Sequence, residues 1–177
     1  MIGVRVVGSD DWQVWRELRL AALADAPEAF ASQLADWQGD GDQEERWRGR
    51  LSIPGSCNVI AVLDGRPVGM VSGFPGARDG VAELGTLWVS RVARGQGIGD
   101  RLVQAVERWA MQAGIGMLLL TVSPDNERAI ALYRRNGFDD AGCSGADGRQ
   151  HSRMAKVLPE LIQPGSGYSE SSWDSER

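Results

Sequence analysis

Residues 87–99 read LWVSRVARGQGIG, and this glycine-rich stretch decides the fold. It continues an apolar segment, Val81–Val89, whose composition predicts a strand. It leads into residues 98–110, where apolar side chains recur every three to four positions and predict an amphipathic helix. Met117–Val122 is then a continuous apolar run, typical of a central strand with a parallel neighbour. Strand, glycine loop, helix and strand together predict an α/β fold.

The three glycines of this loop, Gly95, Gly97 and Gly99, alternate along the chain. They lie where a strand ends and a helix begins, and the backbone amides of a helix's first turn have no acceptor within the helix. Such amides bind phosphate groups with the help of the helix dipole, and missing side chains at Gly97 and Gly99 let a ligand approach the backbone. The glycines alone are equally compatible with a tight turn that serves close packing.

Two familiar nucleotide-binding loops do not match this stretch. A dinucleotide fingerprint requires a glycine or alanine three positions after Gly97, and the chain has Asp100 there, which argues against a nicotinamide oxidoreductase. An ATP-type loop requires Gly-Lys-Ser/Thr, whereas the only lysine is Lys156. The loop therefore predicts a phosphate site of another kind.

The remaining pattern predicts one domain over residues 1–159. The side-chain oxygens of residues 9–11 are suited to cap a helix that starts near Trp12 and stops before Pro27. Residues 160–177 are rich in Gly and Ser and predict a flexible low-complexity tail. The other predicted elements are a strand at Val4–Val7, a helix at Glu44–Leu51, a hairpin of Asn58–Leu63 and Val68–Phe74, a helix at Asn126–Arg135, and strands at Phe138–Ala141 and Ser152–Leu158.

Composition excludes several classes of function. A net charge of −5 over 177 residues argues against a nucleic-acid partner, because such proteins carry a basic face. Cys57, Cys143 and His151 are scattered without metal-type spacing, so no metal is expected. No signal peptide follows Met1, and no apolar run approaches the length of a membrane span. We therefore expect a cytoplasmic protein with no membrane partner.

Two motifs carry a resemblance to a known family. Arg94-x-x-Gly97-x-Gly99 resembles the coenzyme A loop of the GNAT superfamily of acetyl-CoA-dependent N-acetyltransferases. Asn126-x-x-Ala129-x-x-Leu132-Tyr133 followed by Gly137-Phe138 is similar to the next helix of that family, at the usual distance. The likeness in layout extends over about residues 2–158. It implies a GNAT-like central mixed β-sheet flanked by helices, in which two neighbouring parallel strands, Val81–Val89 and Met117–Val122, splay apart to form the CoA cleft.

The resemblance also implies the residues that bind acetyl-CoA, here a cosubstrate. The backbone of the strand end pairs with the pantetheine arm, the amides of the loop hold the pyrophosphate, and the second motif contacts the arm and the sulfur. Asn126 is equally readable as a plain helix N-cap. The implied cofactor-binding residues are Leu87, Trp88, Val89, Arg94, Gly95, Gln96, Gly97, Ile98, Gly99, Asn126 and Tyr133.

Two residues are the candidates for catalysis. Tyr133 stands where the family places the acid that protonates the CoA sulfur; the alternative is an aromatic residue of the helical core. Glu83 stands where several members carry a catalytic glutamate, and strand alternation predicts one face for Glu83, Gly85 and Leu87. An exposed or ion-paired Glu83, with proton transfer relayed by water, is the alternative. Acetylases of ribosomal-protein N-termini use a glutamate on the following strand, where this chain has Thr121, and this weakens that substrate assignment.

The acceptor is predicted from residues 25–45, which the family places over the acceptor site. The resemblance implies acetyl transfer directly to a primary amine. Because residues 25–45 contain seven acidic residues and no basic one, we expect that amine to belong to a cationic small molecule. The alternative is that these acidic residues are only a solvated run of charges with no ligand. Two other functions stay open, an acetyltransferase of protein or peptide amines and a non-catalytic acyl-CoA-binding regulatory domain. The prediction also allows a homodimer.

Overall fold

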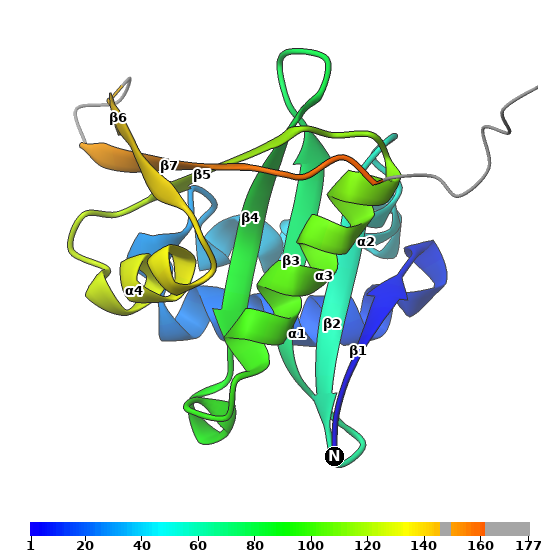
Figure 1. Cartoon of the computed structure of the whole chain (residues 1–177). Coiled ribbons are helices and arrows are strands. Elements are labelled where there is room, and N and C mark those ends of the chain that lie inside the picture. Colours follow the sequence, from blue (N-terminus) through cyan, green and yellow to red (C-terminus); the bar gives the residue numbers. More distant parts are fainter. Residues whose placement is uncertain (146–149, 162–177) are drawn as a thin grey trace, which may run out of the picture.

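The computed structural model describes residues 1–145 and 150–161, which form a seven-stranded sheet with helices on both faces (Figure 1). The strand order is β1-β2-β3-β4-β5-β7-β6, with β4 and β5 parallel and every other neighbouring pair antiparallel. This confirms the predicted mixed sheet. The strands are β1 (Ile2–Val7), β2 (Cys57–Leu63), β3 (Arg66–Pro75), β4 (Val81–Val89), β5 (Met117–Val122), β6 (Asp139–Ser144) and β7 (His151–Val157), and the α-helices are α1 (Trp12–Asp25), α2 (Glu44–Leu51), α3 (Ile98–Gln112) and α4 (Glu127–Arg135).

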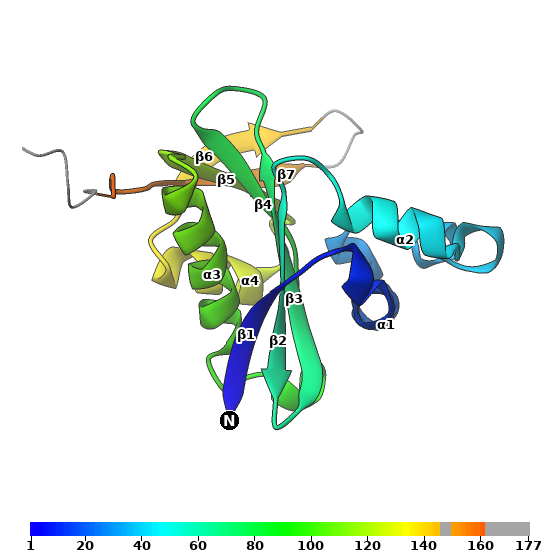
Figure 2. The ribbon, with the colours of Figure 1, turned by 90° about the vertical axis from the view of Figure 1, so that its right-hand side faces the viewer.

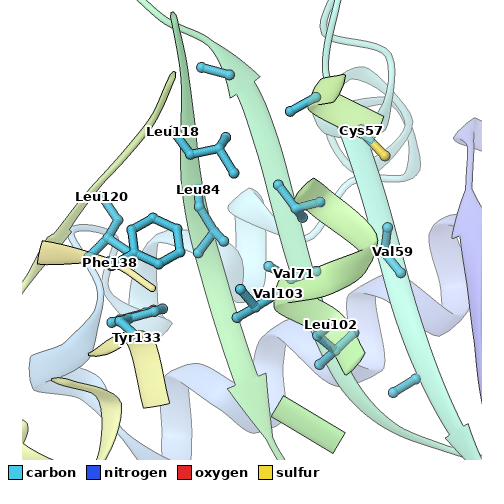
Figure 3. Close-up of a cluster of buried hydrophobic side chains, with 14 of the residues drawn as sticks. Cys57, Val59, Val71, Leu84, Leu102, Val103, Leu118, Leu120, Tyr133 and Phe138 are labelled. Carbon is cyan, nitrogen blue, oxygen red and sulfur yellow. The ribbon is translucent and has the colours of Figure 1, made fainter. Parts of the chain in front are cut away.

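The helices divide between the two faces of the sheet, as the edge-on view of Figure 2 shows. α3 and α4 cover one face and enclose a first core cluster, which includes Val71, Leu84, Leu102 and Phe138 (Figure 3). α1 and α2 cover the opposite face and enclose a second core cluster, which contains four tryptophans. These are Trp15, Trp37, Trp47 and Trp88. Each face of the central strands is therefore buried against its own pair of helices.

The predicted elements lie within a few residues of the observed ones, but the start of α1 is built differently. Residues 9–11 form a short 3-10 helix, and no side chain caps α1. The Asp11 carboxylate instead accepts hydrogen bonds from the backbone amide of Gly8, at 3.0 Å, and from Arg5, at 2.8 Å. The capping prediction was wrong because Asp11 turns back to the preceding strand end, where it holds β1 to the start of the helix.

The parallel pairing of β4 with β5 is short. It extends only from the pair Val81↔Met117 to the pair Glu83↔Leu119, although β4 continues to Val89. Beyond this point the two strands diverge, as Figure 1 shows. The prediction of two splayed parallel strands is confirmed, and the end of β4 has no strand partner on its β5 side among the described residues.

A β-bulge interrupts β4 between the residues that pair with β5 and the unpaired end of the strand. Gly85 pairs with Ser72 and Trp88 pairs with Met70, so two residues of β4 lie opposite one residue of β3. Thr86, the first of the two, has a φ of 60°, and this left-handed conformation reverses the alternation of side chains. Leu87 therefore packs with the first core cluster, away from the face of Gly85. The predicted common face of Glu83, Gly85 and Leu87 was wrong, because alternation cannot account for an inserted residue.

The predicted tail lies largely outside the described residues, which end at residue 161, and the domain boundary at residue 159 stays a prediction. No helix in the described part of the chain is long and apolar enough to cross a membrane.

The packing of α3 on β3 depends on Gly69, and this yields a test of the fold. A Cβ atom there would lie 3.1 Å from the Leu102 side chain and 3.1 Å from the Trp88 carbonyl oxygen. Gly69→Val should lower the free energy of unfolding by about 1–3 kcal/mol in chemical denaturation, because the core has no room for the side chain. Gly49→Ala, on the exposed face of α2, is the control and should stabilise the protein by about 0.5–1 kcal/mol. Equal effects of the two variants would contradict the packing assigned to Gly69.

Candidate functional site

A cleft of about 1130 Å³ opens where β4 and β5 part. Its walls are the segment after α1, the end of β4, the glycine loop, the segment between β5 and α4, and one side of α4 along its whole length. Of the residues predicted to bind the cofactor, all except Gln96 and Tyr133 line it. The two predicted catalytic residues, Glu83 and Tyr133, are not among its lining residues.

The end of β4 forms one wall with its backbone. Leu87, Trp88 and Val89 follow the last parallel pair, so on the cleft side their backbone groups face no strand among the described residues. The carbonyl oxygen of Val89 accepts a hydrogen bond from the Arg94 side chain, at 2.9 Å. An extended chain laid along this edge has backbone donors and acceptors to pair with.

The glycine loop presents amides to the cleft. Gly95 and Gly97 have φ values of 77° and 76°, and a Cβ atom at either position would meet nothing within 4 Å. In the described part of the chain, the first amide of α3 that reaches a backbone acceptor is that of Arg101, 3.2 Å from the carbonyl oxygen of Gly97. The amides of Ile98 and Gly99 therefore stay available to an anion at the start of a 15-residue helix, whereas the amide of Asp100 hydrogen-bonds its own carboxylate.

Gly99 serves packing rather than ligand access. A Cβ atom there would lie 2.9 Å from a methyl carbon of Leu132, so its absence lets α3 and α4 approach closely. Both readings of the loop glycines thus apply, with Gly95 and Gly97 open to the cleft and Gly99 against a neighbouring helix.

Asp25, the last residue of α1, holds the loop in place. Its carboxylate accepts hydrogen bonds from the Trp88 indole, at 3.0 Å, and from Arg94, at 2.5 Å, and it forms an ion pair with Arg91. The Trp88 indole and the two guanidinium groups lower the pKa of Asp25 to about 2, against the opposing effect of burial. The end of β4 and the glycine loop are therefore both fastened to α1.

Asp100 does not face the cleft with an unbalanced charge. Its carboxylate accepts two hydrogen bonds from Arg135, at 2.9 and 3.0 Å, and one from Asn136, at 2.9 Å. The Arg135 hydrogen bond is the main cause that lowers the pKa of Asp100. The other basic residues of the cleft are Arg91 and Arg94, which both pair with Asp25, and Arg128, which forms no ion pair among the described residues.

Asn126 is the N-cap of α4, as the plainer of its two interpretations predicted. Its Oδ1 atom accepts a hydrogen bond from the Ala129 amide, at 3.2 Å. Its Nδ2 atom has no acceptor among the described residues, and the side chain lines the cleft. Capping and ligand binding are thus compatible at this position.

Tyr133 lies in the first core cluster, with 7% of its surface exposed. Its ring packs edge-on against Phe138, with centroids 5.8 Å apart (Figure 3). Burial raises the pKa of the phenol well above its ordinary value, so the hydroxyl stays protonated. Its chain neighbour Leu132 lines the cleft, whereas Tyr133 does not.

Glu83 is exposed, so the cost of burying a carboxylate gives no argument for a role. It pairs with Phe74 in the sheet and with Leu119 at the last parallel position. Its side chain therefore lies on the face of α1 and α2, where the two strands begin to part. It forms no ion pair with residues 1–145 or 150–161.

Three of the seven acidic residues in residues 25–45, namely Asp25, Asp42 and Glu44, form ion pairs with arginines. Asp42 forms a two-point ion pair with Arg16 and accepts a hydrogen bond from the Trp47 indole, at 2.8 Å. These donors, with Arg16 the larger cause, lower the pKa of Asp42 to about 2. Asp25 is engaged as described, and Glu44 pairs with Arg48. Only part of the predicted acidic surface thus remains for a ligand.

Sequence reasoning missed Arg19 and Arg50, which lie half-buried on the face of α1 and α2. A signal for Arg19 was present, because it falls between Leu18 and Ala22 on the apolar face of α1. Asp25 was counted as part of an acidic surface, and nothing local indicated that it would fasten residues more than sixty positions away.

The chain is similar in sequence to known acetyltransferases. The sequence profile described as "Acetyltransferase (GNAT) family" matches residues 15–138. An IAA acetyltransferase of Azospirillum brasilense is 36% identical over 55% of this chain and 64% of its own. An L-2,4-diaminobutyric acid acetyltransferase of Nocardia farcinica is 31% identical over 72% of this chain and 61% of its own. The chain thus spans less than two thirds of the length of these relatives.

Among solved structures, the PaiA N-acetyltransferase of Thermoplasma acidophilum in complex with coenzyme A superimposes with a TM-score of 0.70. The match is 19% identical in sequence and covers 89% of this chain and 99% of that one. At this identity the likeness concerns the fold.

The Asp25 contacts predict a pH-dependent stability. Asp25→Asn should lower the melting temperature at pH 7 by about 2 to 8 °C, because three charge-assisted or indole hydrogen bonds are weakened. The folded-state pKa is lowered from 3.8 to about 2, so this stabilisation is present above pH 3.8 and is lost as the pH falls toward 2. The difference between wild type and variant, followed by calorimetry, should therefore shrink over that range.

Asp40→Asn, which changes an exposed carboxylate of the same connection, is the matched control and should leave the melting temperature unchanged. A difference for Asp25→Asn that stays constant down to pH 3 would contradict the role given to its ionised form.

Proposed function

Because the chain belongs to the acetyltransferase (GNAT) family, we propose that it transfers an acetyl group from acetyl-CoA directly to the primary amine of a small molecule. One observation carries the proposal: the cleft between the diverging β4 and β5 has unpaired strand backbone on one side and the amides of a glycine loop at its mouth. These are the two kinds of group that an amide-containing arm and a pyrophosphate require.

The residues present fit acetyl-CoA. The backbone of Leu87–Val89 pairs with the pantetheine amides, and Asn126 donates its Nδ2 hydrogens to the same arm. The amides of residues 95–99 hold the pyrophosphate, with Gly95 and Gly97 leaving the approach open, since the Arg94 amide already donates to the Arg91 carbonyl oxygen. Gln96 and Ile98 contribute through their backbone, since the first side chain is exposed and the second is buried in the core.

Acetyl transfer requires a neutral amine and a proton for the leaving thiolate. When bound, acetyl-CoA supplies a thioester whose C–S bond breaks as the amine nitrogen forms the new C–N bond, while one proton leaves the nitrogen and one joins the sulfur. Glu83 takes the proton from the amine on the side of α1 and α2, and the protonated Tyr133 hydrogen-bonds and protonates the sulfur from the side of α4. The two residues thus act from opposite faces of the sheet.

The acceptor is a small molecule in this proposal. One relative is named for an amino acid, diaminobutyrate. In addition, this chain has Thr121 at the position where acetylases of ribosomal-protein N-termini use a glutamate. The cationic acceptor expected from residues 25–45 keeps only part of its support, because Asp25, Asp42 and Glu44 are paired with arginines. Protein or peptide amines remain an outcome that an acceptor panel would reveal.

The test is amine-dependent release of CoA thiol, with the acetylated product located by mass. Tyr133→Phe should lower kcat by about 100-fold, because the sulfur loses its proton donor. Its affinity for acetyl-CoA, measured by calorimetry, should stay unchanged because the ring remains in the core. Acetyl-CoA binding by the wild type without turnover of any amine would favour a non-catalytic acyl-CoA-binding domain. Full activity of Tyr133→Phe would make Tyr133 a core aromatic residue only.

The role of Glu83 has its own test. Glu83→Gln should lower kcat by about 100-fold at neutral pH and recover as the pH rises, because the amine then loses its proton to solvent. Glu17→Gln, an exposed change on α1, is the control and should retain wild-type rates. A Glu83→Gln variant as active as the control would show that water relays the proton without a dedicated base.

A further inference from the structure

Arg50 of α2 is half-buried over the sheet and contacts only neutral groups. Its guanidinium donates to Asn58 Oδ1 at 3.2 Å, to Ser72 Oγ at 3.1 Å and to Thr86 Oγ1 at 3.3 Å. It also lies over the rings of Phe74, at 4.7 Å, and Trp15, at 5.5 Å. The side chain is thus held in one position by contacts that leave its charge unbalanced.

Arg19 of α1 lies close enough to Arg50 for the two charges to repel each other. Its guanidinium stacks on Phe30, 4.6 Å from the ring centroid. Its Nη1 atom is buried and has no hydrogen-bond partner in the described part of the chain. Burial lowers the pKa of both arginines to about 10, and for Arg19 the charge of Arg50 contributes as well.

Neither arginine forms an ion pair within residues 1–145 and 150–161. Seven other arginines do so, among them Arg16, Arg94 and Arg135 with their aspartates. Within the described part of the chain, Arg19 and Arg50 are the two arginines whose pKa is lowered mainly by burial, and neither has a counter-charge. Two adjacent buried cations are costly unless an anion joins them, and the guanidinium fork matches a carboxylate in shape and charge.

Neither arginine lines the cleft, but both contact residues at its edge. Thr86, which Arg50 contacts, directly precedes the cleft residue Leu87, and Phe30, which Arg19 contacts, itself lines the cleft. Phe74 under Arg50 is the sheet partner of Glu83, so the proposed base lies on the same face. Both arginines are half-buried rather than enclosed, which leaves part of each side chain accessible.

We infer that Arg19 and Arg50 bind a carboxylate of the acceptor, so that the amine that is acetylated belongs to an amino acid or a closely similar amino carboxylic acid. The inference rests on the proposed function and specifies its substrate class. The carboxylate supplies the missing counter-charge, and the amine of the same molecule is directed toward Glu83 and the acetyl group. The amine nitrogen loses one proton and gains the acetyl group, whereas the carboxylate is unchanged.

The experiment compares matched acceptors that differ only in this group. Wild-type protein and acetyl-CoA are incubated with a panel of L-amino acids, with L-2,4-diaminobutyrate, and with the C-terminal amide of each. Thiol release should be at least roughly 10-fold faster, in kcat/KM, for the preferred acid than for its amide, because the amide lacks the charge. Spermidine and an aminoglycoside are included as cationic acceptors without a carboxylate.

Variants then assign the effect to the arginines. Arg19→Gln and Arg50→Gln should each raise the KM for the acid by roughly 10- to 100-fold and thereby remove most of the difference between acid and amide, while the KM for acetyl-CoA stays unchanged. Arg19→Lys, which keeps the charge but not the fork, should fall between wild type and Arg19→Gln. Arg66→Gln, at the exposed β2–β3 turn, is the control. Melting curves identify variants that fail to fold, and the acid–amide comparison in the wild type does not depend on them.

Binding of each acid and amide, measured by calorimetry in the presence of CoA, separates the two proposals. Acids that bind while amides do not, with no turnover, would support the carboxylate site and overturn the acetyltransferase function. Turnover of amides, spermidine or the aminoglycoside at rates equal to or above those of the acids would support the function and overturn the carboxylate site. Absence of both binding and turnover of every acid would likewise overturn the site.

Discussion

The early end of the pairing between β4 and β5 is the constraint on which the site depends. Backbone groups inside a sheet need partners, and beyond the pair Glu83↔Leu119 the two strands no longer supply them to each other. The cleft opens at this point, and the glycine loop and the start of α4 lie around it. α3 and α4 can close around the same cleft because Gly99 lets them approach. A ligand with amide groups and phosphates completes what the sheet leaves unpaired.

The bulge in β4 determines which side chains point to each face of the sheet. Thr86 turns toward Arg50 on the side of α1 and α2, whereas Leu87 packs with the core under α3. Trp88 then faces the second core cluster, and its indole reaches Asp25 at the end of α1. Because of one inserted residue, three consecutive positions of β4 serve different parts of the site. Thr86 contacts Arg50, Leu87 lines the cleft, and Trp88 contacts Asp25.

The fold shows which charged residues are paired with each other and which are not. Residues 25–45 contain seven acidic residues, but Asp25 and Asp42 act as structural acceptors for arginines and indoles. Among the buried charges of the described residues, those of Arg19 and Arg50 have no counter-charge, although the net charge of the whole chain is −5. Desolvation makes each of these cations costlier to the fold than an exposed carboxylate, because solvent screens the latter.

Local patterns in the sequence determined the elements, one parallel pair of strands and the residues of the glycine loop, because hydrophobic periodicity, turn chemistry and helix ends are properties of neighbouring residues. The mixed sheet was implied by the resemblance of two motifs to a known family. The tertiary structure alone decided the fate of the polar groups. It placed Tyr133 in the core, left Glu83 exposed, reversed the face of Leu87 and brought Arg19 beside Arg50. These outcomes depend on strand register and on contacts between distant segments, and no local pattern carries that information.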